Sequence, residues 1–200
     1  MRTNYSFAPD LGVAGGLYDM TEHVVDTYNN EANDGDLKFG MGVVLGTGKG
    51  KAAKPTSSAT INDFEGVLLN GGTTEHTMDG DVRILNGNTL GVLKQGRIWA
   101  RIAEDAEPAY GKPVLLVVNG TDAGLFTTAD DEDNASNVIA INAKFLGGKG
   151  TGDVAPVEIY PTVIVAPTVA AAETTEPTPS NGQEEQSPAA DPDPETVSNP

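Results

Sequence analysis

Short apolar runs, each closed by a turn signal, recur through residues 64–128 and constrain the fold more than any other feature. The runs lie at residues 67–69, 82–85, 90–93, 98–102, 114–118 and 125–126. Turn-forming residues close them at 70–72, 86–88, 95–96, 108–111 and 119–120. A spacing of about 8–12 residues between turns is typical of an all-β sandwich or barrel. The sequence therefore predicts an all-β fold, a small antiparallel barrel or sandwich.

One run shows how its strand is oriented. In residues 96–102 the apolar Ile98, Ala100 and Ile102 alternate with Arg97, Trp99 and Arg101. This two-residue period is that of a strand with one buried face. We expect Ile98 and Ile102 to face the core and the two arginines to face away from it.

The composition changes sharply after residue 165. Residues 167–200 hold seven of the 13 prolines and seven acidic residues, but no lysine or arginine. Such a segment buries too little apolar surface to offset its ordering entropy, about 1–2 kcal/mol per residue. We predict a disordered C-terminal tail at 166–200. A β-rich body is expected at 37–165, whose last strand, at 155–165, is interrupted by Pro161 and so lies at an edge or a bulge.

Residues 1–36 lack a sustained period and are interpreted as an N-terminal arm. Within them, residues 21–31 are compatible with a short helix or, equally, residues 23–28 with a strand rich in β-branched residues. The alternative to an arm is an N-terminal strand pair in the same core. Burial of the large apolar side chains between residues 7 and 28 does not offset the ordering cost, so we expect the arm to need backbone pairing as well. The candidate partner-binding residues are Phe7, Leu17, Tyr18, Val24, Val25 and Tyr28.

The charge argues against several classes of partner, and the absence of cysteine excludes one class of chemistry. The chain carries a formal net charge of −17, whereas nucleic-acid backbones and anionic membrane surfaces attract clustered lysine and arginine. We therefore expect no nucleic acid and no membrane as partners. Without cysteine there is no disulfide or thiol chemistry. The N-terminus also lacks the apolar run of a signal peptide, which predicts synthesis in a cytoplasm without export.

Motifs for cofactors and metals are incomplete. The glycine-rich residues 46–51 depart from a phosphate loop in spacing and lack its Ser or Thr. The acidic residues 130–134 lack the central glycine and the bidentate glutamate of a helix-flanked calcium loop. His23 and His76 have no second ligand at zinc spacing. We expect no cofactor and no metal.

Catalytic and stacking residues are also weakly indicated. Glu104, Asp105 and Glu107 could serve a hydrolase if they lay in a cleft, but a polar turn needs them only for solubility. Trp99 and Tyr110 could stack on a ligand, although one tryptophan in a strand is more often part of a core or an interface. We predict that the protein is not an enzyme.

Five segments, in sequence order, resemble the structural cement proteins of tailed phages. They are GGLYDMTEHVVDTYNNE (15–31), LKFGMGVVLG (37–46), FEGVLLNGGTTEHTMDGDV (64–82), LGVLKQGRIWARIAEDAEPAYGKPVLLV (90–117) and FLGGKGTGDVAPVEIY (145–160). The resemblance implies a non-enzymatic virion protein on the capsid exterior that binds the major capsid protein and reinforces the shell. It also favours a homo-oligomer, with a trimer at local three-fold positions as the first expectation. It does not cover the tail.

Two other functions fit the residues. The β body could be a head-fibre or surface adhesin module that recognises a glycan or a host surface, or a small β-fold hydrolase. Binding to purified capsids, compared with binding to cells or glycans, separates the cement protein from the adhesin. A cleft with convergent carboxylates would favour the enzyme.

Overall fold

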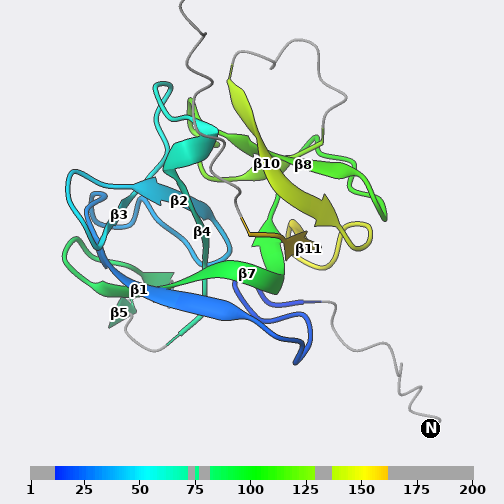
Figure 1. Cartoon of the computed structure of the whole chain (residues 1–200), viewed down its shortest axis with the longest axis horizontal. Helices are drawn as coiled ribbons and strands as arrows, with labels where there is room; N and C mark the ends of the chain where they lie inside the picture. The colour runs from blue at the N-terminus through cyan, green and yellow to red at the C-terminus, as the bar shows by residue number, and fades with distance from the viewer. Residues whose placement is uncertain (1–11, 72–74, 77–81, 129–136, 162–200) are drawn as a thin grey trace, which may run out of the picture. The chain divides into compact units, whose positions relative to one another are not determined.

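The computed structural model describes residues 12–71, 75–76, 82–128 and 137–161, and strands make up nearly all of the regular secondary structure in these ranges (Figure 1). The elements are β1 (Val24–Asn30), β2 (Gly42–Leu45), β3 (Lys51–Ala53), η1 (Ile61–Asp63), β4 (Phe64–Leu68), β5 (Glu75–His76), β6 (Val82–Arg83), β7 (Thr89–Arg101), β8 (Pro113–Val117), β9 (Phe126–Thr127), β10 (Val138–Phe145) and β11 (Val154–Ile159). Within the described ranges the 3-10 turn η1 is the single helical element. The all-β prediction is confirmed.

Five strands form a small barrel. They pair in the order β1-β3-β2-β4-β7, and a further pairing of β1 with β7 closes the ring. β1 and β3 are parallel, and the other pairs are antiparallel. The predicted small barrel is confirmed, and it is mixed, with four antiparallel pairs and one parallel pair. An odd number of strands cannot alternate in direction all the way around a closed ring, so at least one neighbouring pair must be parallel.

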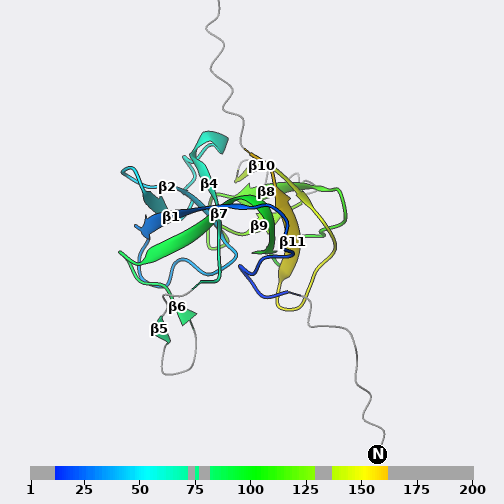
Figure 2. The ribbon, with the colours of Figure 1, turned by 60° about the horizontal axis from the view of Figure 1, so that its bottom comes forward.

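The remaining strands extend from β7 into a second region. There the pairing order is β7-β11-β10-β8-β9. β9, at the end of this order, returns to the end of β7. Ile102 and Phe126 form an isolated parallel bridge there, and the Ala103 N–H donates to the Phe126 carbonyl over 2.9 Å. A separate two-stranded sheet pairs β5 with β6 (Figure 2). The long strand β7 therefore belongs to both regions.

The turn predicted at residues 95–96 is wrong, because β7 runs through it as one strand of 13 residues. Gly96 has a φ of +129°, and a Cβ there would lie 2.8 Å from the Cβ of His23. Its glycine is required by a bend within a strand and a close approach, not by a chain reversal. At this point β7 changes partners, from β1 and β4 before Gly96 to β11 from Gly96 onward.

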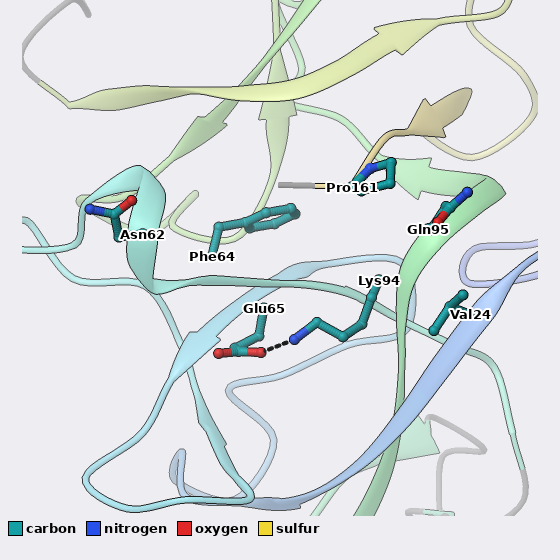
Figure 3. Close-up of a pocket in the computed structure, with 7 residues that line it drawn as sticks. All are labelled: Val24, Asn62, Phe64, Glu65, Lys94, Gln95 and Pro161. Atoms are coloured by element: carbon teal, nitrogen blue, oxygen red, sulfur yellow. Dashed lines mark hydrogen bonds and ion pairs between the residues drawn. The ribbon is translucent and has the colours of Figure 1, made fainter. Parts of the chain in front are cut away.

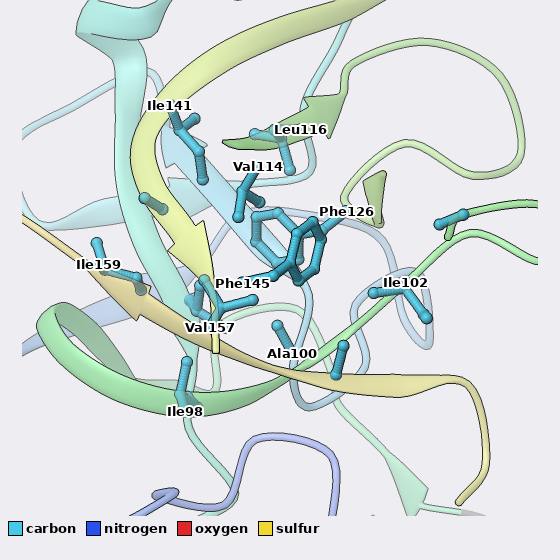
Figure 4. Packing of buried hydrophobic residues seen from close by; sticks show 14 of the residues in the cluster. Ile98, Ala100, Ile102, Val114, Leu116, Phe126, Ile141, Phe145, Val157 and Ile159 are labelled. Atoms are coloured by element: carbon cyan, nitrogen blue, oxygen red, sulfur yellow. The ribbon is translucent and has the colours of Figure 1, made fainter. Parts of the chain in front are cut away.

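Two apolar clusters lie on the two sides of β7. The larger holds 18 buried residues, among them Ile98, Phe126 and Phe145 (Figure 4). The smaller, inside the barrel, holds nine, among them Leu90 and Val92. The side-chain alternation of a strand sends Leu90 and Val92 into the barrel and Leu93 into the larger cluster.

The predicted register at residues 96–102 is confirmed. Ile98 and Ile102 are buried in the larger cluster, while Arg97 and Arg101 are half-buried on the other face. The two-residue period of the sequence decides which side chains of this strand face the core, as expected for a sheet with one buried face.

The strand predicted at residues 23–28 is confirmed and the helix at 21–31 is wrong, since Val24–Asn30 pairs with β7 and β3. Part of the segment assigned to the arm thus closes the barrel. Residues 1–11 of the arm and 162–200 around the tail lie outside the described residues, so the division into arm, body and tail stays a prediction.

The position of the last strand differs from the prediction. β11 ends at Ile159, with Pro156 inside it and Pro161 beyond its end. β11 lies between β7 and β10, not at an edge. Pro156 is tolerated there because the paired stretch with β10 ends at Val157, one residue away, so the missing N–H interrupts no paired residue of that ladder.

Candidate partner-binding surface

Exposed large apolar side chains gather in one part of the chain. Eight such residues occur among those described, and five lie between residues 13 and 25; these five are Val13 (64% exposed), Tyr18 (42%), Met20 (91%), Val24 (44%) and Val25 (41%). We call these five residues the N-terminal apolar surface. Scattered single apolar residues are normal on a protein surface, whereas a contiguous exposed patch marks an interaction site. Residues 13–25 are the stretch in which the exposed apolar residues of the described chain are concentrated in sequence.

The backbone of residues 15–18 pairs with β7. The Gly15 N–H donates to the Trp99 carbonyl over 2.8 Å, and the Trp99 N–H donates to the Gly16 carbonyl over 2.9 Å. The Tyr18 N–H donates to the Arg97 carbonyl over 3.0 Å. Because β11 occupies one edge of this half of β7, residues 15–18 occupy the other. The apolar residues of this segment are thus presented from a defined backbone.

Two further features hold this segment in place. The first is a close backbone approach at Gly15. A Cβ there would lie 2.7 Å from the Asn70 nitrogen, and Gly15 has a φ of +76°, so only glycine fits. The ring of Tyr18 lies against that of Trp99, with 5.4 Å between centroids and 55° between planes. Tilted pairs of this kind are a favourable aromatic arrangement. Tyr18 is therefore both exposed and held in place.

An ionic network joins the N-terminal segment to the second region, at β7, β10 and β11. The Arg97 guanidinium contacts Asp19 at 2.8 Å and Glu158 at 2.9 Å, and Lys144 contacts the other oxygen of Glu158 at 3.0 Å. The Tyr160 hydroxyl donates to that same oxygen over 2.7 Å. The Tyr160 hydrogen bond, followed by those from Lys144 and Arg97, lowers the pKa of Glu158 to about 2. Hydrogen bonds to Asp19 and Glu158 raise the pKa of Arg97. The network holds Asp19, between Tyr18 and Met20, against the sheet.

A pocket of about 320 Å³ opens beside Val24. Figure 3 shows its lining, which comes from Val24, Asn62, Phe64, Glu65, Lys94, Gln95 and Pro161. The Lys94 ammonium donates to the Glu65 carboxylate and, over 3.0 Å, to the Tyr28 hydroxyl. Burial would lower the pKa of Lys94, but its hydrogen bonds to Glu65 and Tyr28 outweigh burial and raise it. The charged groups neutralise one another, so this network ties β1, β4 and β7 together without offering a free acid or base.

The comparisons with known proteins decide the identity. A family model described as "Structural cement protein (E217 gp24/Pam3 gp6)" matches residues 1–160. The chain belongs to the phage structural cement protein family. No curated protein matches it.

A solved structure shares the fold. A chain in the structure titled "The capsid of Myoviridae Phage XM1" superposes on the cement protein with a TM-score of 0.58 at 19% sequence identity. The match covers 80% of this chain and 98% of that chain. The resemblance predicted from sequence is confirmed: the protein is a non-enzymatic phage capsid component of the structural cement family.

The candidate residues of the cement protein separate into exposed and buried groups. Tyr18, Val24 and Val25 are exposed, whereas Leu17 is half-buried against the larger cluster and Tyr28 is 8% exposed in the barrel. Phe7 lies outside the described residues.

Val13 and Met20 were absent from the candidate set. Both are apolar residues in an aperiodic stretch, so no sequence signal separates them from half-buried neighbours such as Leu17. Their exposure depends on which backbone groups of the segment pair with β7.

Other chemistry is not assembled in the described part of the chain. It contains no group of three His, Asp or Glu side chains placed to hold a metal ion. Residues 130–134, the acidic loop, lie outside it. Glu104, Asp105 and Glu107 are exposed on the turn before Pro108. No described helix is long and apolar enough to cross a membrane.

Proposed function

We propose that this cement protein attaches to the major capsid protein, on the outside of the shell, through the N-terminal apolar surface. The observation that carries the proposal is the concentration of five of the eight exposed large apolar residues in positions 13–25. Of the other exposed ones, Leu45 and Tyr110 come from separate parts of the chain, and Val82 lines the same pocket as Val13.

The way this surface is built supports the proposal. Binding loses less entropy when the contacting side chains are already ordered. Tyr18 is packed on Trp99, and the backbone bonds of residues 15–18 to β7 hold the segment. Tyrosine is also enriched among the residues that dominate binding energies.

For the oligomeric state we propose a trimer at local three-fold positions of the shell. The net charge of −17 opposes association of free copies. Assembly would then depend on the capsid lattice, whose symmetry places the copies. A map of the decorated capsid with and without this protein would show whether its density has three-fold symmetry.

The proposal is tested by adding the full chain to purified capsids that lack it. We expect co-sedimentation with the capsids and a higher temperature of capsid disruption. The variant Tyr18→Ala/Met20→Asp should bind at least about ten-fold more weakly, equivalent to about 1.4 kcal/mol. Tyr110→Ala, at a residue that is 77% exposed outside this surface, is the matched control and should bind normally.

Two results would contradict the proposal. Equal binding by the double variant and by the wild type would place the attachment elsewhere on the protein. Binding of the wild type to cells or glycans but not to capsids would favour the adhesin function instead.

A further inference from the structure

The strand β1 has one open edge. Its even-numbered residues bond to β7, as the Asn30 N–H does to the Asn88 carbonyl over 2.8 Å. Its odd-numbered residues face the other way, as the Asn29 N–H does toward the Gly50 carbonyl over 2.8 Å. The N–H and C=O groups of successive residues in a strand point alternately to its two edges. Those of Val25 and Thr27 therefore point to the same edge as those of Asn29.

Nothing in the described ranges pairs with this edge at Val25 and Thr27. β3 reaches β1 only at Asn29 and Asn30. Before β3, the chain turns sharply, with the Gly46 N–H donating to the Lys51 carbonyl and the Lys51 N–H to the Gly48 carbonyl. The place beside Val25 and Thr27 that a longer β3 would fill is therefore left open.

From this we infer that the open edge of β1 at Val24–Thr27 accepts an extended segment of the major capsid protein as an added strand. This inference rests on the proposed function and names how the attachment is made. An unpaired edge offers main-chain hydrogen bonds to an incoming strand, and neighbouring side chains supply specificity. Here the neighbouring side chains are Val24 and Val25, both more than 40% exposed.

The pocket beside this edge could hold a side chain of the added strand, which favours an extended segment as the binding partner. Val24 belongs both to β1 and to the pocket lining, together with Phe64 and Pro161 (Figure 3). An added strand that follows β1 passes this opening, so one of its apolar side chains can enter it. Strand addition with alternate side chains in pockets is a recurrent mode of peptide recognition.

The charge of the edge favours the capsid over a second copy of this chain. Glu22 and Asp26 are exposed on either side of Val24 and Val25. Two-fold pairings of β1 with itself centred on Asp26 or Val24 would set Asp26 opposite Asp26 or Glu22. Like charges directly opposite each other are destabilising. The net charge of −17 opposes a second copy in the registers centred on Val25 or Thr27. The incoming segment should therefore be apolar, with lysine or arginine and without acidic residues.

The test blocks the edge and leaves the β1–β7 ladder intact. Thr27→Pro removes an N–H that faces the open edge, and proline is tolerated at such positions of edge strands. Thr27→Ala removes the same side chain but keeps the N–H. With capsids that lack the protein, we expect Thr27→Pro to bind at least ten-fold more weakly than wild type and Thr27→Ala to bind within two-fold of it. Equal binding by Thr27→Pro and wild type would overturn the inference.

Hydrogen exchange decides the matter if Thr27→Pro fails to fold. In the wild-type protein the Val25 and Thr27 amides should exchange rapidly when free and become protected on capsids. Unchanged exchange on capsids would overturn the inference. So would protection of these amides in free protein that sediments as an oligomer, because the occupant would then be a second copy. A wild-type chain that does not bind capsids at all would instead reject the proposed function.

Discussion

The two halves of β7 belong to two regions that differ in the size of their buried cluster and in their free strand edges. Before Gly96 the strand closes a small barrel around nine buried residues, and its neighbour β1 keeps an open edge. From Gly96 onward it lies between β11 and residues 15–18, over a cluster of 18 buried residues. Hydrophobic stabilisation grows with the apolar area removed from water. The second region should therefore dominate stability, while the barrel supplies the edge for binding.

Polar groups are also used differently in the two regions. In the barrel, Lys94 joins three strands from a partly buried position, next to Glu65 and Tyr28. In the second region, Arg97 and Glu158 join the N-terminal segment to the sheet near the surface. A polar group that loses its partner costs more when it is buried than when it is exposed. The four predictions that follow use these contrasts.

The largest effect is expected in the larger cluster. Phe145 is fully buried there, and Phe145→Ala should lower the free energy of unfolding by about 3–5 kcal/mol through lost burial and a cavity. Urea titration followed by circular dichroism measures it. Leu68→Ala, in the barrel cluster, provides the comparison and should cost less. A larger loss for Leu68→Ala would reverse the assignment of the stabilising region.

The junction between the halves should be nearly as sensitive. Gly96→Ala combines an unfavourable φ of +129° with a contact of 2.8 Å to His23, for an expected loss of about 2–4 kcal/mol. Gly91→Ala is the control in the same strand, because a Cβ there meets its nearest atoms at 3.8 Å. It should change stability by less than about 0.5 kcal/mol. Equal losses for the two variants in thermal unfolding would show that Gly96 is not specifically required.

A smaller effect is expected from the barrel network. Lys94→Met leaves the Glu65 carboxylate, 14% exposed, without its cation, and should cost about 1–2 kcal/mol. Lys49→Met, at an exposed lysine of the loop before β3, should be neutral. Adding Glu65→Gln to Lys94→Met should recover part of the loss, as a double-mutant cycle would show. An additive result would mean that the two side chains do not stabilise each other.

The smallest effect concerns acid. The pKa of Glu158 is lowered from 4.5 to about 2 in the folded state, so its contribution is complete above about pH 4.5 and is lost as pH falls toward 2. We expect this loss to be about 1 kcal/mol or less, because the network is close to solvent. Urea titrations between pH 6 and 2 should therefore show a steeper decline for wild type than for Glu158→Gln. Parallel curves would show that this carboxylate does not stabilise the fold.

The sequence by itself determined the local elements. The short apolar runs with glycine-rich turns predicted an all-β chain, and the alternation at residues 96–102 placed Ile98 and Ile102 in the core. These features follow from side-chain period and turn chemistry, which act between near neighbours. The ordered series of matching segments also predicted the cement family that the family model shows.

Only the tertiary structure decided how these pieces join. Gly96 is at a bend and not a turn, next to the closely approaching His23, and one barrel pair, β1 with β3, is parallel because five strands close a ring. Leu17 packs against the larger cluster and Met20 faces solvent, although the two lie three residues apart in an aperiodic segment. Each of these outcomes depends on partners far away in the sequence, and no local pattern records which backbone edge a segment will find.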